Sequence, residues 1–342
     1  MRVWNGYQKG VNLGGWFSQC DHTEARYDTF IRDEDFAVIK RWGADHVRVP
    51  IDYELVETKT AEPIEDGYLR LRKTIDLCRA NGLNMVLDLH KTAGFSFDAN
   101  EGEAGFFDNA LYQERFMRLW ENIARHFGGE ADMLAFELLN EVTEKEYRDT
   151  WNRIASECIR RIRAIAPDVY ILVGGYYHNS AVAVKDIDVP YDERIVYNFH
   201  CYEPLIFTHQ GAYWMPKMDR AFRIPVTATF GEMAEADVAM GTLSCAGYDR
   251  YSPDTTLSGE YFKAFMAEAA AVAAQKNVPL YCGEYGVIDC ATPGDTVEWY
   301  RMIHEAFEQY GIGHAAWSYR EMDFGLADAR LDGVRERLLR YL

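Results

Sequence analysis

The chain has 342 residues, of which 48% are hydrophobic and 26% charged, which is typical of a globular protein that buries a large core. Its formal net charge of −18 argues against nucleic acid or an anionic lipid surface as a partner, because phosphate groups would repel it. The seven cysteines form no C-x-x-C pair, which favours free thiols over a zinc site or a redox dithiol.

The sequence shows little sign of membrane insertion or secretion. The sequence has no apolar run long enough to span a bilayer, and its first residues lack the apolar region of a secretory signal. We therefore expect no membrane association, and either a protein that stays inside the cell or a secreted one that has been trimmed. The expected oligomeric state is a monomer.

The predicted strands are eight short apolar runs in which β-formers dominate, near residues 9–13, 45–50, 84–89, 133–139, 169–174, 195–199, 279–283 and 312–317. Amphipathic helices are predicted between them, at 109–127, 146–165, 261–276 and 295–310. Alternation of strands and helices predicts parallel βαβ units, and eight strands close a barrel. We predict the α/β class and a single (β/α)8 TIM barrel over residues 1–342. An open doubly wound sheet is the main alternative, but Gly14-Gly15 is too short for its glycine-rich phosphate turn.

One connection is longer than the others. About 80 residues separate the sixth predicted strand from the seventh, roughly twice the usual step from strand to strand. Residues 203–258 are rich in aromatic residues and methionine. We predict a small subdomain inserted between strand 6 and helix 6, acting as a lid over the substrate, because strand-to-helix loops lie on the active face of a barrel. Structural filler is the alternative.

Polar side chains stand at the ends of most predicted strands. They are Arg48, His90, Asn140, Glu141, His200, Tyr202, Glu284 and Trp317. Each residue alone is better explained by a structural role, such as a helix cap, a satisfied histidine or a core tryptophan. In a parallel barrel, however, all these strand ends meet in one bowl, so their coincidence predicts an active site.

Two carboxylates facing each other across a bowl are the minimum equipment for glycoside hydrolysis. We predict Glu284 as the nucleophile, kept ionised by Arg48 and a tyrosine hydroxyl, and Glu141 as the acid/base. Glu141 follows an apolar run and lies beside the neutral Asn140, surroundings that favour a protonated carboxyl. Asn140 is expected to bond the sugar 2-hydroxyl, and Trp317 to stack on the sugar ring.

In order and spacing, these residues resemble glycoside hydrolase family 5, the cellulase family. The matching segments are GVNLGGW (10–16), HVRVP (46–50), VLDLH (86–90), FELLNE (136–141), YNFHCY (197–202), YCGEYG (281–286) and AWSY (316–319). The resemblance runs from residue 10 to about 325, and all eight characteristic active-site positions are kept. Among family members, the chain is most similar to small single-domain endoglucanases with an insertion after strand six.

The resemblance implies roles for several residues. Glu141 would be the acid/base and Glu284 the nucleophile, with Arg48 and Tyr202 supporting the nucleophile. His200 would lie near the acid/base, and His90 would contact the sugar in the −1 subsite. Lys91 departs from the pattern, because many cellulases have a second histidine or another polar residue there. No metal and no organic cofactor is implied.

The predicted activity is endo-acting, retaining hydrolysis of β-1,4-glucan, including soluble cellulose and mixed-linkage β-1,3-1,4-glucan. Further sugar contacts are predicted at Trp16, Tyr176, Asn179 and Trp214. A rival hypothesis keeps the mechanism but changes the substrate to another β-glycan, either β-1,3-glucan or mannan and glucomannan, or changes the action to that of an exo-acting β-glucosidase. The GVNLGGW opening also resembles exo-β-1,3-glucanases of the same family, so the linkage specificity stays open.

Two hypotheses from different functional classes compete with hydrolysis by paired carboxylates. The first is a carbohydrate-binding barrel without catalysis, which would be expected to lack one of the two carboxylates, but both are present. The second is a metal-dependent enzyme using His90, His200 and a glutamate, but no metal-binding H-E-x-x-H spacing occurs. We therefore favour neither.

Overall fold

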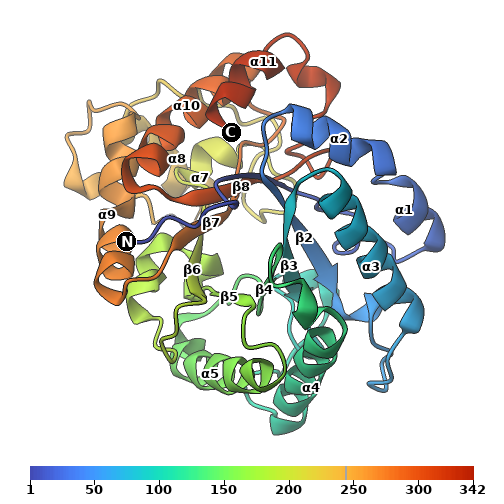
Figure 1. The fold of residues 1–342 in the computed structure, drawn as a ribbon. Coiled ribbons are helices and arrows are strands. Elements are labelled where there is room, and N and C mark those ends of the chain that lie inside the picture. Colours follow the sequence, from blue (N-terminus) through green and yellow to red (C-terminus); the bar gives the residue numbers. More distant parts are fainter. Residues whose placement is uncertain (243–244) are drawn as a thin grey trace.

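A computed structural model describes residues 1–242 and 245–342 of the chain. Its eight parallel strands form a closed barrel in sequential order from β1 to β8, and β1 pairs with β8. Figure 1 shows the strands at the centre and the helices around them. The strands are β1 (Lys9–Asn12), β2 (His46–Asp52), β3 (Asn84–Lys91), β4 (Leu134–Glu137), β5 (Tyr170–Val173), β6 (Ile195–Cys201), β7 (Leu280–Tyr285) and β8 (Gly313–Ala316).

The predicted (β/α)8 TIM barrel is confirmed, and the strands lie within about two residues of the predicted runs. The α-helices are α1 (Glu24–Thr29), α2 (Asp33–Arg41), α3 (Glu65–Ala80), α4 (Ala110–Phe127), α5 (Arg148–Ile165), α6 (Tyr176–Asn179), α7 (Leu205–Thr208), α8 (Phe230–Met240), α9 (Gly259–Lys276), α10 (Pro293–Tyr310) and α11 (Arg335–Leu338). The fifth connection departs from the regular pattern, because β5 is followed by the short α6 and a 3-10 helix, η5 (Ala181–Asp186).

Between β6 and α9 the chain forms α7, α8 and a 3-10 helix, η6 (Tyr248–Arg250). Helix α8 begins with a capping box, in which Thr229 and Glu232 each bond the other's backbone N–H. Residues 243–244 of the predicted 203–258 insertion lie outside the described residues. That these elements form a separate lid-like subdomain stays a prediction.

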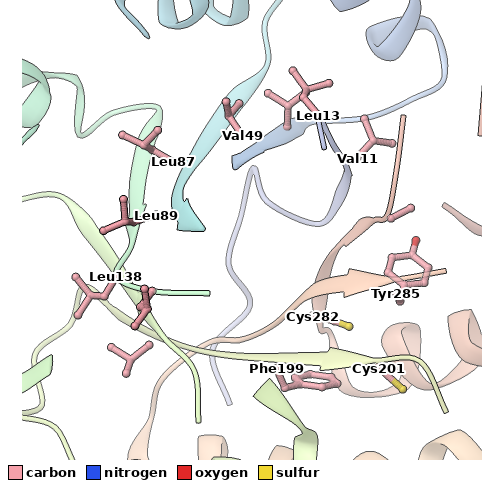
Figure 2. Close-up of a cluster of buried hydrophobic side chains, with 14 of the residues drawn as sticks. Val11, Leu13, Val49, Leu87, Leu89, Leu138, Phe199, Cys201, Cys282 and Tyr285 are labelled. Carbon is pink, nitrogen blue, oxygen red and sulfur yellow. The ribbon is translucent and has the colours of Figure 1, made fainter. Parts of the chain in front are cut away.

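The strands separate two cores because their side chains alternate in direction. Apolar residues facing outward pack against the helices, among them Val11, Val49, Leu87 and Phe199. Figure 2 shows these side chains along the strands. A smaller apolar cluster contains Val86, Ala135, Leu172, Val196, Tyr281 and Ala315, with Trp4 and Tyr7 from the N-terminal segment packed on it. The strands therefore hold the residues at their carboxyl ends in fixed positions.

All seven cysteines are free, as the sequence predicts, and four of them are buried. Among the helices of residues 1–242 and 245–342, none combines the length and the apolar character that crossing a membrane requires.

Candidate active site

A buried arginine organises the barrel interior. Arg48 on β2 is fully buried and uses all five of its N–H donors. It donates two hydrogen bonds to Glu137 on β4, at 2.7 and 2.8 Å, and one each to Asn12 and Asn140, at 2.9 Å. The fifth goes to Glu284 Oε1 at 2.7 Å. The planar guanidinium thus fixes several strands and one carboxylate of the site at once.

Glu284, on β7, is held at both of its oxygens. Arg48 occupies Oε1, and the Tyr202 hydroxyl donates to Oε2 at 2.9 Å. Burial, reinforced by the charge of Glu284, raises the pKa of Tyr202 well above its usual range. The phenol therefore stays protonated and can donate its hydrogen bond to Glu284. Two donors on a buried carboxylate stabilise its negative charge and fix its direction, which is what an attacking carboxylate needs.

Glu141 follows β4 and is bonded to two histidines. Nδ1 of His200 lies 2.8 Å from Oε1, and Nδ1 of His178 lies 3.0 Å from Oε2. The backbone of Glu141 has φ +42°, in the left-handed region that non-glycine residues seldom adopt. Such backbone strain often accompanies functional positions.

The surroundings of Glu141 differ from the prediction. An apolar environment that keeps the carboxyl protonated was expected, but burial, which raises the pKa of Glu141, is outweighed by the two imidazole hydrogen bonds, which lower it below its usual range. The apolar residues before Glu141 pack in the core, so they do not surround its carboxyl. The free enzyme therefore holds Glu141 as a carboxylate beside its histidines.

The two glutamates lie across the bowl from each other. One carboxylate oxygen of each, together with a ring nitrogen of His200, falls within a cluster whose atoms are all within 4.8 Å of one another. His200 Nδ1 lies 2.8 Å from Glu141 Oε1 and 3.7 Å from Glu284 Oε2, so the same ring nitrogen approaches both carboxylates. Oxygen, nitrogen and oxygen at such spacing also suit a metal ion, so the geometry of the cluster is compatible with both uses.

His90 and Trp317 form one wall of the site. Their rings are nearly parallel, with centroids 5.7 Å apart. His90 Nδ1 is 2.6 Å from Asp88 Oδ2, and Asp88 also contacts Arg48 at 3.0 Å. Burial lowers the pKa of His90, but the neighbouring Asp88 carboxylate more than compensates and leaves the pKa raised. The metal-dependent hypothesis that uses His90 is not supported, because the cluster of possible ligands does not include it.

The four residues predicted as peripheral sugar contacts differ in burial and in the contacts that they already make. The side chain of Asn179 is fully buried, like that of Asn140, and its contact with the sugar stays a prediction. Trp16 stacks on Phe17 at 3.8 Å and donates its indole N–H to the backbone of Tyr27, which are core contacts. Tyr176 is buried and donates to Asp186. Trp214 is 39% exposed, near His209 and Phe324, and keeps a surface for a ligand.

Several residues of the site were missed. Asp88 and Glu137 lie inside apolar strands, at positions that alternation directs into the barrel, and this was a readable signal. Asn12 and Asn198 complete the same buried polar layer through bonds to Arg48 and Glu137. His178 carried no comparable signal, because it lies several residues beyond the end of β5, in a short segment with irregular backbone angles.

Comparison with known proteins decides the family. Residues 5–323 match the family described as cellulase (glycosyl hydrolase family 5). The chain belongs to glycoside hydrolase family 5. Like its relatives, this family 5 chain is a glycosidase, and the predicted family is confirmed.

Two curated relatives of this glycosidase extend over most of its length. Cellodextrinase A of Ruminococcus flavefaciens is 48% identical over 307 residues, covering 90% of this chain and 84% of the relative. Endoglucanase C of Acetivibrio thermocellus is 32% identical over 342 residues, covering 98% of each. Among solved structures, endoglucanase Cel5A of Thermotoga maritima superposes with a TM-score of 0.76 at 22% identity, covering 98% of this chain and 97% of that one, which supports the fold.

Proposed function

We propose that this glycosidase hydrolyses β-1,4-linked glucan by an endo-acting, retaining double displacement. The observation that carries the mechanism is the approach of a Glu141 oxygen to a Glu284 oxygen within 4.8 Å. Retaining glycosidases keep their carboxyl groups about 5–5.5 Å apart, whereas inverting ones leave about 6.5–9.5 Å for a water molecule. The spacing therefore favours direct attack by one carboxylate.

In the first step the carboxylate of Glu284 attacks the anomeric carbon while Glu141 gives a proton to the glycosidic oxygen, and the bond to the leaving sugar breaks. In the second step Glu141 takes a proton from water as the water oxygen attacks the same carbon and Glu284 leaves. Arg48 and Tyr202 stabilise the negative charge on Glu284 before attack and after release. Asn140 and His90 are proposed to bond the sugar, and Trp317 to stack on it.

The glucan assignment is supported by the names of the relatives, an endoglucanase and a cellodextrinase. The 48% identity to the cellodextrinase favours a second candidate, release of short products from cello-oligosaccharides. A panel of carboxymethyl cellulose, barley β-glucan, laminarin, mannan and cellohexaose, with sizing of the products, tests both. Rapid loss of viscosity with mixed oligosaccharides is expected. Cleavage of mannan or laminarin with resistance of both β-1,4-linked glucans would overturn the glucan assignment.

The metal-dependent hypothesis has a simple test. Exhaustive chelation with EDTA followed by gel filtration is expected to leave kcat/KM on barley β-glucan unchanged, because the proposed chemistry uses only protein carboxyls. Activity that falls on chelation and returns with a divalent cation would assign Glu141, His200 and Glu284 to a metal instead.

We propose that the segment 203–258 acts as a lid that supplies sugar contacts. Trp214 lies against His209, with ring centroids 6.0 Å apart, and His209 packs on Tyr202 at 5.1 Å. Ala212 and Met215 of the same segment pack with Trp317. The segment thus borders the two side chains that flank the proposed sugar site.

Trp214→Ala is expected to raise KM for cellohexaose about tenfold with little change in kcat, because the ring would bind ground state and transition state alike. Val238→Ala, at an 85% exposed position on α8 of the same segment, serves as the control and should behave as wild type. An unchanged KM for Trp214→Ala would remove Trp214 from the substrate site.

A further inference from the structure

His178 is the residue near the carboxyls whose role the proposed mechanism does not explain. Its Nδ1 lies 3.0 Å from Oε2 of Glu141, and His200 occupies the other oxygen at 2.8 Å. Both oxygens of the acid/base are therefore bonded to imidazole nitrogens. An acid must direct a proton on one oxygen at the glycosidic oxygen, and an imidazole that supplies this proton gives up its own bond to that oxygen as it does so.

The two histidines differ in how freely they can move. The His200 side chain is 1% exposed, projects from β6 and also lies 3.7 Å from Glu284. The His178 side chain is 55% exposed and comes from a short irregular segment after β5. Displacing a half-exposed ring costs little, because water can replace its lost contacts. The bond from His178 is thus the one that a leaving sugar can replace.

The backbone holds His178 against the same loop as Glu141. Tyr177, His178 and Asn179 have consecutive φ values of +51°, +54° and +56°, and a run of three such residues in the left-handed region is unusual. Two backbone bonds tie the run down, from Tyr177 N to Thr143 O at 3.1 Å and from His178 N to Val142 O at 3.0 Å. A strained conformation fixed in this way places the imidazole at Glu141.

The charges around His178 favour an imidazolium. Glu141, Glu144 and Glu284 contribute negative charge at the ring, and His209 and His200 are the other titratable groups near this cluster. Burial lowers the pKa of His178, but the bond to Glu141 and the carboxylate charges outweigh it and leave the pKa raised. A proton shared by His178 and Glu141 is accordingly retained to higher pH than a carboxyl alone would hold it.

We infer that His178 is a positioning residue that stores the proton which Glu141 delivers to the leaving group. In the free enzyme the proton resides on the imidazole and the carboxyl is ionised. When the sugar binds, the N–H bond breaks, an O–H bond forms at Glu141 Oε2, and the glycosidic oxygen replaces the ring as partner of that hydroxyl. The proton then passes to this oxygen as its bond to the anomeric carbon breaks. The inference rests on the proposed retaining mechanism.

The test is His178→Asn, because asparagine tolerates the left-handed backbone and its amide still donates to Glu141 but carries no titratable proton. The alkaline limb of kcat/KM for 4-nitrophenyl cellobioside is expected to move down by at least about one pH unit, since it would report a carboxyl instead of an imidazolium. With 2,4-dinitrophenyl cellobioside, whose leaving group needs no proton, kcat/KM should stay within about twofold. His126→Asn, at an exposed histidine of α4, is the control and should change neither profile.

The outcomes separate the inference from the function on which it rests. An alkaline limb that is unchanged in His178→Asn would overturn the proton-storage role. Equal losses on both cellobiosides at every pH would also overturn it, since they indicate a general distortion of the site. If wild-type enzyme cleaved neither cellobioside while hydrolysing another β-glycoside, the glucan proposal would fail, and the same pH comparison on aryl derivatives of that glycoside would still test His178.

Discussion

Glu284→Gln is expected to lower kcat/KM on barley β-glucan by at least about 10⁴-fold, because an amide cannot form the glycosyl ester and the nucleophile acts only in the transition state. The substitution keeps the size of the side chain, and the amide oxygen can still accept from Arg48 or Tyr202, whose bonds to Glu284 are 2.7 and 2.9 Å long. Thermal unfolding and a binding assay with cellotetraose check that the fold and the site persist.

A matched change at a distant carboxylate provides the control. Glu268→Gln alters an exposed residue of α9 that pairs with Lys185 on the surface, and it should retain full activity. A Glu284→Gln variant with more than about one hundredth of wild-type activity, free of deamidated or contaminating enzyme, would exclude Glu284 as the nucleophile.

Arg48→Met is expected to destabilise the protein by about 3–5 kcal/mol, because removal of one partner leaves buried carboxylates without their counter-charge. Glu137, Asp88 and Glu284 all lie within 3.0 Å of the guanidinium, and Arg48 itself is fully buried. Methionine fills the volume of the arginine stem, so the loss reports charge and hydrogen bonding more than packing. The shift in the midpoint of urea unfolding, at an unchanged slope, measures this loss of unfolding free energy.

Two companion variants keep this prediction interpretable. Arg79→Met removes a surface arginine paired with Glu130 and Asp132, and it should cost less than about 1 kcal/mol. Arg48→Lys preserves the charge without the five-donor fork, so it should fold even if Arg48→Met does not, with an intermediate stability and reduced activity. Wild-type stability in Arg48→Met would show that the buried network contributes little to the fold.

The fold was predictable because its determinants are local and repeated. Each strand is a buried apolar run, and a helix such as α4 carries its apolar residues at helical spacing, so the pattern alone places them. The eight strand-end residues were predictable for a related reason: in a closed barrel, strand order determines which ends meet. The short fifth connection, between β5 and β6, was not predictable from the sequence, since η5 lacks the length and periodicity of an α-helix.

The environment of the acid/base was not predictable from the residues next to it in sequence. The apolar run before Glu141 turns into the core, and its carboxyl meets His200 and His178 from two other elements. Those contacts depend on the three-dimensional approach of β6 and of an irregular segment after β5, which no local pattern encodes. The same limit applies to Asn179, adjacent to His178, whose burial is not apparent from the residues around it in sequence.

The assignment of the two glutamates is tested most directly by azide rescue of Glu284→Gly. Removal of the nucleophile opens space on the α face of the sugar, where azide can attack in its place while Glu141 still assists the leaving group. With 2,4-dinitrophenyl cellobioside, we predict recovered turnover and an α-cellobiosyl azide, identified by its anomeric proton coupling. A β-cellobiosyl azide would reverse the roles of Glu141 and Glu284 and contradict this account.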